Sequence, residues 1–166
     1  MPYIPFNEYF PSLGEQETRA ITLLDDRFAP IPAGEYGLIE MFCDEADCDC
    51  RRVMFSVASS LEQRIVAVVA YGWESRAFYA QWFGRKNDEV IDEMQGPVLN
   101  KASLQASYAP AFLNLIRELL SKDKTYVERI KQHYNLFREK VANGSAQKSD
   151  GRRNRMFGSK KHGIKN

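Results

Sequence analysis

Three apolar stretches decide the fold of this chain, and they are Tyr36-Gly-Leu-Ile-Glu-Met-Phe-Cys43, Val53-Met-Phe-Ser-Val-Ala58 and Ile65-Val-Ala-Val-Val-Ala-Tyr-Gly-Trp73. Each has the length and the β-branched and aromatic content of a strand, and the connections between them are short. The run Ile65–Tyr71 is apolar on both faces of the pleat, which is typical of a central strand covered on two sides. These stretches predict an antiparallel meander, to which the aromatic alternation of Phe78–Phe83 adds a fourth strand.

Helical periodicity follows the predicted strands. Residues 87–94 are compatible with a short helix that ends before Gly96-Pro97, and Tyr108–Ser121 carries one apolar stripe. A further helix begins at Asp123, or at the competing capping box of Thr125, and we expect Asn143-Gly144 to end it. We therefore predict an α+β fold: an antiparallel β-meander of four to five strands packed against a C-terminal antiparallel helical hairpin.

Breaks in these patterns divide the chain into three parts. Residues 1–33 contain five of the seven prolines, and we expect an irregular lead-in there; Thr18–Leu24 fits one strand or a short helix. Residues 34–142 form the predicted α+β, metal-binding domain. Residues 143–166 are basic and are expected to be flexible, since they contain few apolar residues.

Composition limits the class of protein. A chain of 166 residues with 44% hydrophobic residues can bury a single core without disulfides. No apolar run is long enough to span a bilayer, and the first residues do not resemble a secretory signal, so we expect no membrane partner. An odd number of cysteines, three, favours reduced thiols and a cytoplasmic protein. The net charge of +1 hides a tail of +6 on a body of −5.

All three cysteines fall within eight positions, in Cys43-Asp-Glu-Ala-Asp-Cys48-Asp-Cys50-Arg-Arg. Thiolates this close together favour a tetrahedral metal ion, and we predict one structural Zn²⁺ per chain. A closed zinc site needs a fourth ligand. His133, on the flank of the last helix, is the preferred candidate, and an acidic residue of the loop is the alternative (Asp44, Glu45, Asp47 or Asp49). Without a metal, the cysteines would be buried small hydrophobes or redox-active thiols.

The segments Gly34–Phe55 (GEYGLIEMFCDEADCDCRRVMF) and Tyr126–Val141 (YVERIKQHYNLFREKV) resemble a family of uncharacterised bacterial proteins. In that family a Cys-Asp-x-x-x-Cys-Asp-Cys-Arg-Arg-Val segment occurs together with a His-Tyr-x-x-Phe-Arg helix. The resemblance covers most of residues 33–141 and implies no activity. It supports pairing His133 with Cys43, Cys48 and Cys50, because these are the metal-competent residues of the two matching segments.

Some members of that family end in a SEC-C motif, a small zinc-binding segment also known from the C-terminus of the SecA translocation ATPase. The tail Gly151-Arg-Arg-Asn-Arg-Met-Phe-Gly-Ser-Lys-Lys-His-Gly163 resembles this motif, but every cysteine of the motif is absent. We therefore expect no zinc to be bound by the tail.

The function best supported by the sequence is a zinc-stabilised binding module whose partner is an unidentified, acidic protein. One alternative is a metal- or thiol-dependent enzyme, which is not favoured because none of the common catalytic fingerprints is present. The other is weak binding to a nucleic acid or ribosome through the tail, with phosphate contacts from its seven cations: Lys148, Arg152, Arg153, Arg155, Lys160, Lys161 and Lys165. The sequence does not predict an oligomeric state.

Overall fold

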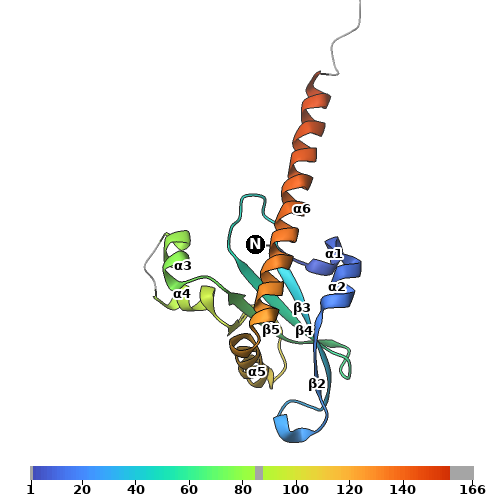
Figure 1. Cartoon of the computed structure of the whole chain (residues 1–166), viewed down its shortest axis with the longest axis vertical. Helices are drawn as coiled ribbons and strands as arrows, with labels where there is room; N and C mark the ends of the chain where they lie inside the picture. Colours follow the sequence, from blue (N-terminus) through green and yellow to red (C-terminus); the bar gives the residue numbers. More distant parts are fainter. Residues whose placement is uncertain (1, 85–87, 158–166) are drawn as a thin grey trace, which may run out of the picture.

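A computed structural model describes residues 2–84 and 88–157 of the chain, with side chains placed up to residue 144. The fold is α+β, as predicted: one antiparallel sheet carries the C-terminal helices on one face (Figure 1). Its strands are β1 (Tyr3–Pro5), β2 (Arg19–Leu23), β3 (Gly34–Cys43), β4 (Arg52–Ser59), β5 (Arg64–Gly72) and β6 (Val98–Leu99).

The sheet is built around the predicted meander. Strands β3, β4 and β5 pair in sequence, and β6 follows β5. The outer edge of β3 is shared by two strands: β1 pairs with its end at Cys43 and β2 with its beginning at Gly34. The segment Thr18–Leu24, which fitted a strand or a helix, therefore contributes an edge strand.

In the described part of the chain, four of the α-helices connect strands of this sheet, and two follow its last strand. The helices are α1 (Phe6–Tyr9), α2 (Pro11–Glu17), α3 (Arg76–Phe83), α4 (Asp88–Gln95), α5 (Ala109–Lys122) and α6 (Lys124–Phe157), with a short 3₁₀ turn, η1 (Asp26–Phe28). The predicted helices at 87–94 and 108–121 are confirmed as α4 and α5. Asp123 caps α6, since its carboxylate accepts the Tyr126 N–H at 2.9 Å.

Three predictions of local structure were wrong. Phe78–Phe83 belongs to helix α3, because the Ser75 hydroxyl accepts the Phe78 N–H and caps a helix there. The lead-in is not irregular, since residues 3–17 form β1, α1 and α2, and Pro11 occupies the first turn of α2, where its missing N–H costs nothing. Helix α6 does not end at Asn143-Gly144 but continues to Phe157, and Figure 1 shows it extending well beyond the sheet.

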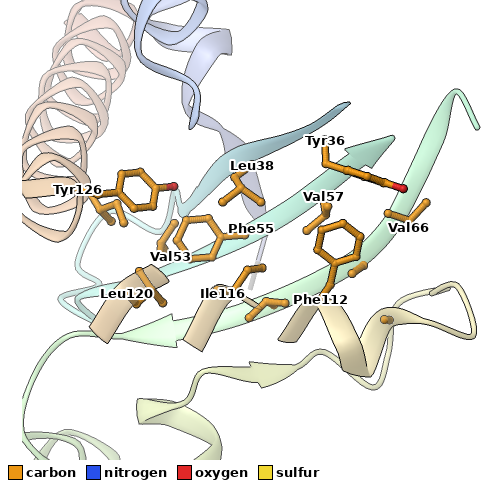
Figure 2. Close-up of a cluster of buried hydrophobic side chains, with 14 of the residues drawn as sticks. Tyr36, Leu38, Val53, Phe55, Val57, Val66, Phe112, Ile116, Leu120 and Tyr126 are labelled. Atoms are coloured by element: carbon orange, nitrogen blue, oxygen red, sulfur yellow. The ribbon is translucent and has the colours of Figure 1, made fainter. Parts of the chain in front are cut away.

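The main core lies between the sheet and helices α5 and α6. Side chains of alternate positions on β3 and β4 meet a stripe of α5, and Tyr126 of α6 lies beside Phe55 (Figure 2). The alternation of side chains along β3 places Tyr36, Leu38 and Phe42 in this core, and it also places Glu40 there.

No helix in the described part of the chain combines the length and apolarity needed to cross a bilayer.

Candidate metal centre

The loop between β3 and β4 brings the three cysteines together. Cys43 is the last residue of β3 and is buried, Cys50 is buried just before β4, and Cys48 is half-buried between them. The Cys48 thiol shares hydrogen bonds with the thiols of both Cys43 and Cys50. The spacing argument is thereby supported at the level of geometry: the three sulfurs form one cluster at the end of the sheet.

Each of these sulfurs also accepts a backbone hydrogen bond from the residue two positions further on. The donors are the N–H groups of Glu45 for Cys43, Cys50 for Cys48, and Arg52 for Cys50. Donors aimed at sulfur stabilise thiolate and orient ligands around a metal ion. The repeated i to i+2 pattern means that the loop backbone itself, and not only the side chains, is arranged around the sulfurs.

Glu45 completes a group that can hold a metal ion. One carboxylate oxygen of Glu45 and the sulfurs of Cys43 and Cys48 all lie within 4.8 Å of one another. Ligand atoms of a tetrahedral zinc site are separated by roughly 3–4 Å, given metal–ligand bonds of about 2.0–2.3 Å. Small rotations of these side chains would therefore suffice for coordination. Glu45 was one of the acidic alternatives weighed for the fourth ligand.

Two tyrosines hold the loop where it turns into β4. Both tyrosines bind the backbone of Arg51, which has a left-handed conformation (φ 47°). The Arg51 N–H donates a hydrogen bond to the Tyr134 hydroxyl at 3.2 Å, and the Arg51 carbonyl accepts one from the Tyr79 hydroxyl at 2.8 Å. Gly72 makes this arrangement feasible, because a β-carbon there would collide with the Tyr79 ring. Arg138 of α6 fixes the other half of the loop through the carbonyls of Cys43 and Ala46 (the guanidinium donates at 3.0 and 2.8 Å).

The cluster is covered on one side by the N-terminal strand. Tyr3 pairs with Cys43 in the β1–β3 register, and its hydroxyl lies close enough to all three thiols to be affected by their charge. Burial, opposed in part by the charge of Arg52 and assisted by the thiols, raises the pKa of Tyr3 to about 12. This phenol therefore stays neutral at physiological pH.

Burial is also the main influence on the thiols, and it raises the pKa of Cys43, Cys48 and Cys50 above the ordinary value of 9.0. The Arg52 charge acts in the opposite direction on Cys50. The neighbouring cation, Arg51, pairs instead with Asp49 and Glu74. In the metal-free state the cluster is thus a group of neutral thiols, and coordination would release their protons.

An open cleft adjoins the cluster on its solvent side. It has a volume of about 330 Å³ and lies between Trp82 of α3 and the loop residues Glu45, Ala46, Asp47 and Cys48. Cys48 is therefore the thiol that solvent or a ligand can approach, whereas Cys43 and Cys50 are enclosed.

The structure does not bring His133 to the cysteines, which corrects the preferred ligand set. Its Nδ1 lies 2.7 Å from a Glu40 oxygen and its Nε2 lies 2.6 Å from a Glu17 oxygen, and the ring stacks on Phe6 at 4.3 Å. Both imidazole nitrogens are thus occupied by carboxylates. The helical flank position predicted for His133 is buried, but it faces the middle of β3, and Cys43 lies at the end of that strand.

The cationic residues proposed to bind nucleic acid lie at the far end of the chain. Helix α6 includes four of them in its last turns, beyond the part that packs on the sheet: Lys148, Arg152, Arg153 and Arg155. Lys160, Lys161 and Lys165 lie outside the described residues.

Residues missed by the sequence reasoning include Glu17 and Glu40, and also Tyr134 and Arg138, which anchor the loop. The signal for Glu40 was available: its position in β3 has the same parity as Leu38 and Phe42, so strand alternation directs this carboxylate into the core. A buried carboxylate needs a partner, and a search for one would have led to His133.

Comparisons with known proteins identify no relative, since no protein-family model, no curated protein and no solved structure matches the chain.

Proposed function

We propose that this protein is a zinc-stabilised binding module in which one structural Zn²⁺ is held by Cys43, Cys48, Cys50 and Glu45. The observation that carries the proposal is the convergence of the Cys43 and Cys48 sulfurs with the Glu45 carboxylate. The Cys50 thiol interacts with the Cys48 thiol beside them, and the backbone N–H groups of Glu45, Cys50 and Arg52 favour the thiolate forms of the three cysteines. Three thiolates and one carboxylate would close a four-coordinate site of the structural kind.

Zinc would stabilise the part of the molecule that is richest in unpaired acidic groups. Asp44, Glu45 and Asp47 form no salt bridge with other residues of the described chain, whereas Asp49 is paired with Arg51. Carboxylates gathered without a cation repel one another and disfavour loss of the thiol protons. A metal ion replaces those protons, offsets the negative charge and makes the loop a fixed part of the surface.

The partner in this proposal is an acidic protein that contacts the basic part of α6. The support is the projection of α6 beyond the sheet together with the sequence of its last turns (Figure 1). The part of a helix that extends beyond its own sheet can present its side chains to a partner surface. Removal of residues 144–166 should abolish this interaction and leave zinc binding intact.

The first experiment is the metal content of the full-length protein, purified without a tag or chelator under reducing conditions and analysed by plasma mass spectrometry. We expect about one zinc ion per chain, lost in Cys48→Ser. A matched pair of charge-neutral variants then tests the fourth ligand: Glu45→Gln should weaken zinc binding, whereas Asp44→Asn should not. If the protein contains no zinc and takes up none, the proposal is refuted.

A metal-dependent enzyme is the second candidate, and the cleft beside Trp82 is the observation in its favour. The cleft reaches Cys48 and Glu45, so a carboxylate that left the metal would open a coordination position toward solvent. Cobalt substitution distinguishes the two functions: visible absorption that is unchanged by azide indicates a closed, structural site, and a spectrum altered by azide indicates an open one.

A further inference from the structure

A second hollow of the described surface lies away from the cysteines, between edge strand β2 and the junction of helices α5 and α6. Its volume is about 720 Å³, within the roughly 300–1,000 Å³ of sites that hold ligands. We call this cavity the β2 groove. Its lining residues are Arg19, Ala20, Ile21, Phe28, Leu115, Glu118, Leu119, Lys122, Asp123, Lys124 and Thr125.

One wall of the β2 groove is a strand with an unused edge. β2 pairs with β3 along five residues, and no other strand of the described chain pairs with it. Half of the backbone groups of such an edge strand point away from the sheet, where they can pair with another extended segment. The groove therefore offers main-chain hydrogen bonds along Arg19, Ala20 and Ile21.

The opposite wall and the floor are apolar. Leu115 and Leu119 are one helical turn apart on α5 and are only half-buried, as is Ile21 on the sheet side. Phe28 of the 3₁₀ turn closes one end and keeps 44% of its surface exposed. A segment paired with β2 would direct every second side chain onto these residues.

Cations predominate at the other end of the groove. Three cations, Arg19, Lys122 and Lys124, lie among the lining residues with only two carboxylates, those of Asp123 and Glu118. Arg19 pairs with Asp123 and Lys122 pairs with Glu118, whereas Lys124 forms no ion pair with any described residue. This end of the groove is complementary to a negative charge.

From these observations we propose that the β2 groove binds an extended peptide of a partner protein by strand addition to β2. The peptide has apolar side chains at alternate positions and an acidic group near Lys124. Strand addition uses the free edge, the alternate side chains fill the space beside Leu115 and Leu119, and the carboxylate meets Lys124. The inference is independent of zinc binding, since no residue of the groove belongs to the cysteine cluster.

The experiment is selection from a phage-displayed library of short random peptides on the full-length, zinc-supplemented protein. We expect enrichment of alternating apolar sequences that contain Asp or Glu. Synthetic copies of the enriched peptides should shift the ¹⁵N–¹H signals of β2 and of the end of α5. Their dissociation constants should rise about tenfold or more in Phe28→Ala and in Lys124→Glu. Lys140→Glu, an exposed charge reversal further along α6, and Leu104→Ala, an exposed apolar truncation elsewhere, should bind as the parent does.

Several results would overturn the proposal. One is a library without enriched peptides, or enriched peptides without acidic residues. Another is equal binding by the parent, Phe28→Ala and Lys124→Glu. If sedimentation shows instead that the chain forms a dimer abolished by Phe28→Ala, the groove is occupied by a second copy of the chain. Circular dichroism of both variants establishes that a loss of binding is not a loss of fold.

Discussion

Two clusters of titratable side chains depend on strand β3, and they differ in what satisfies them. Near the middle of the strand, one Glu40 oxygen meets His133, whose other ring nitrogen meets Glu17, while the buried Oε1 of Glu40 has no hydrogen-bond partner among the described residues. At the end of the strand, Cys43 joins Cys48 and Glu45, whose ligand atoms lie within 4.8 Å of one another.

The difference separates a structural ion pair from a binding site. In the histidine cluster the imidazole of α6 lies between carboxylates of β3 and α2, so the cluster fastens the N-terminal helices to the core. In the cysteine cluster the neutral thiols converge with a Glu45 carboxylate that forms no ion pair with the described residues, which is the arrangement expected of residues that hold an exogenous ion. The partners that the ligand atoms already have, more than burial, therefore distinguish the two.

Removal of zinc should have the largest effect. Because binding free energy adds to folding free energy, we expect chelation to lower the free energy of unfolding by about 5 kcal/mol or more. Urea unfolding of the full chain with and without a chelator measures this difference. In Cys48→Ser the chelator should have no further effect, and an equal loss in both proteins would mean that the chelator acts elsewhere.

Substitution of His133 should have the next largest effect on stability and none on zinc. His133→Ala leaves the buried Glu40 carboxylate without its partner, and we expect a loss of about 3–5 kcal/mol. Glu40→Gln combined with His133→Ala should recover part of that loss, since the unpaired charge is gone. Zinc content is the decisive readout: loss of zinc in the folded His133→Ala variant would make this residue a ligand after all and would remove the contrast between the clusters.

The strands of the meander could be predicted because all are rich in β-branched and aromatic residues, with the alternation of a half-buried strand in β3 and a continuous apolar run, typical of a central strand, in β5. Phe78–Phe83 has a similar aromatic content, and the prediction of a strand there was wrong. Aromatic content does not distinguish a strand from a helix whose aromatic residue, here Tyr79, is buried by tertiary contacts. Its end signals were nevertheless helical: Ser75 caps the first turn, and Gly84, in the left-handed conformation, ends the helix.

The candidate site could be predicted only in part. Proximity in sequence ensures that Cys43, Cys48 and Cys50 meet, because a loop of eight residues cannot hold them far apart. A ligand from a distant helix is a different problem, since it depends on register. His133 has the right chemistry and the right helix face, but the packing of α6 places it opposite Glu40, three residues before Cys43, and this offset cannot be derived from periodicity.

A smaller effect, a dependence of the free energy of unfolding on pH, should arise from the histidine cluster. Burial lowers the pKa of His133, but the hydrogen bonds and charges of Glu40 and Glu17 together outweigh it and raise the pKa above 6.5. The folded protein then binds the proton more tightly than the unfolded chain does. The stabilisation is fully present below pH 6.5 and is lost as the pH rises through the folded-state pKa. Unfolding free energies measured from pH 5.5 to 8.5 should decline accordingly, and the decline should be smaller in His133→Gln.

The smallest effect is expected at the exposed end of the histidine cluster. The Glu17 side chain is 36% exposed and contacts the Nε2 of His133, so solvent screens this pair more than the buried contact with Glu40. Glu17→Gln should therefore cost only about 1 kcal/mol and should lower the pKa of His133. The imidazole proton signals, followed by NMR titration, report that pKa directly, and Glu15→Gln on the same helix is the matched control. If Glu17→Gln were as costly as His133→Ala, both carboxylates would be needed to balance the imidazolium, and Glu40 would not be its principal partner.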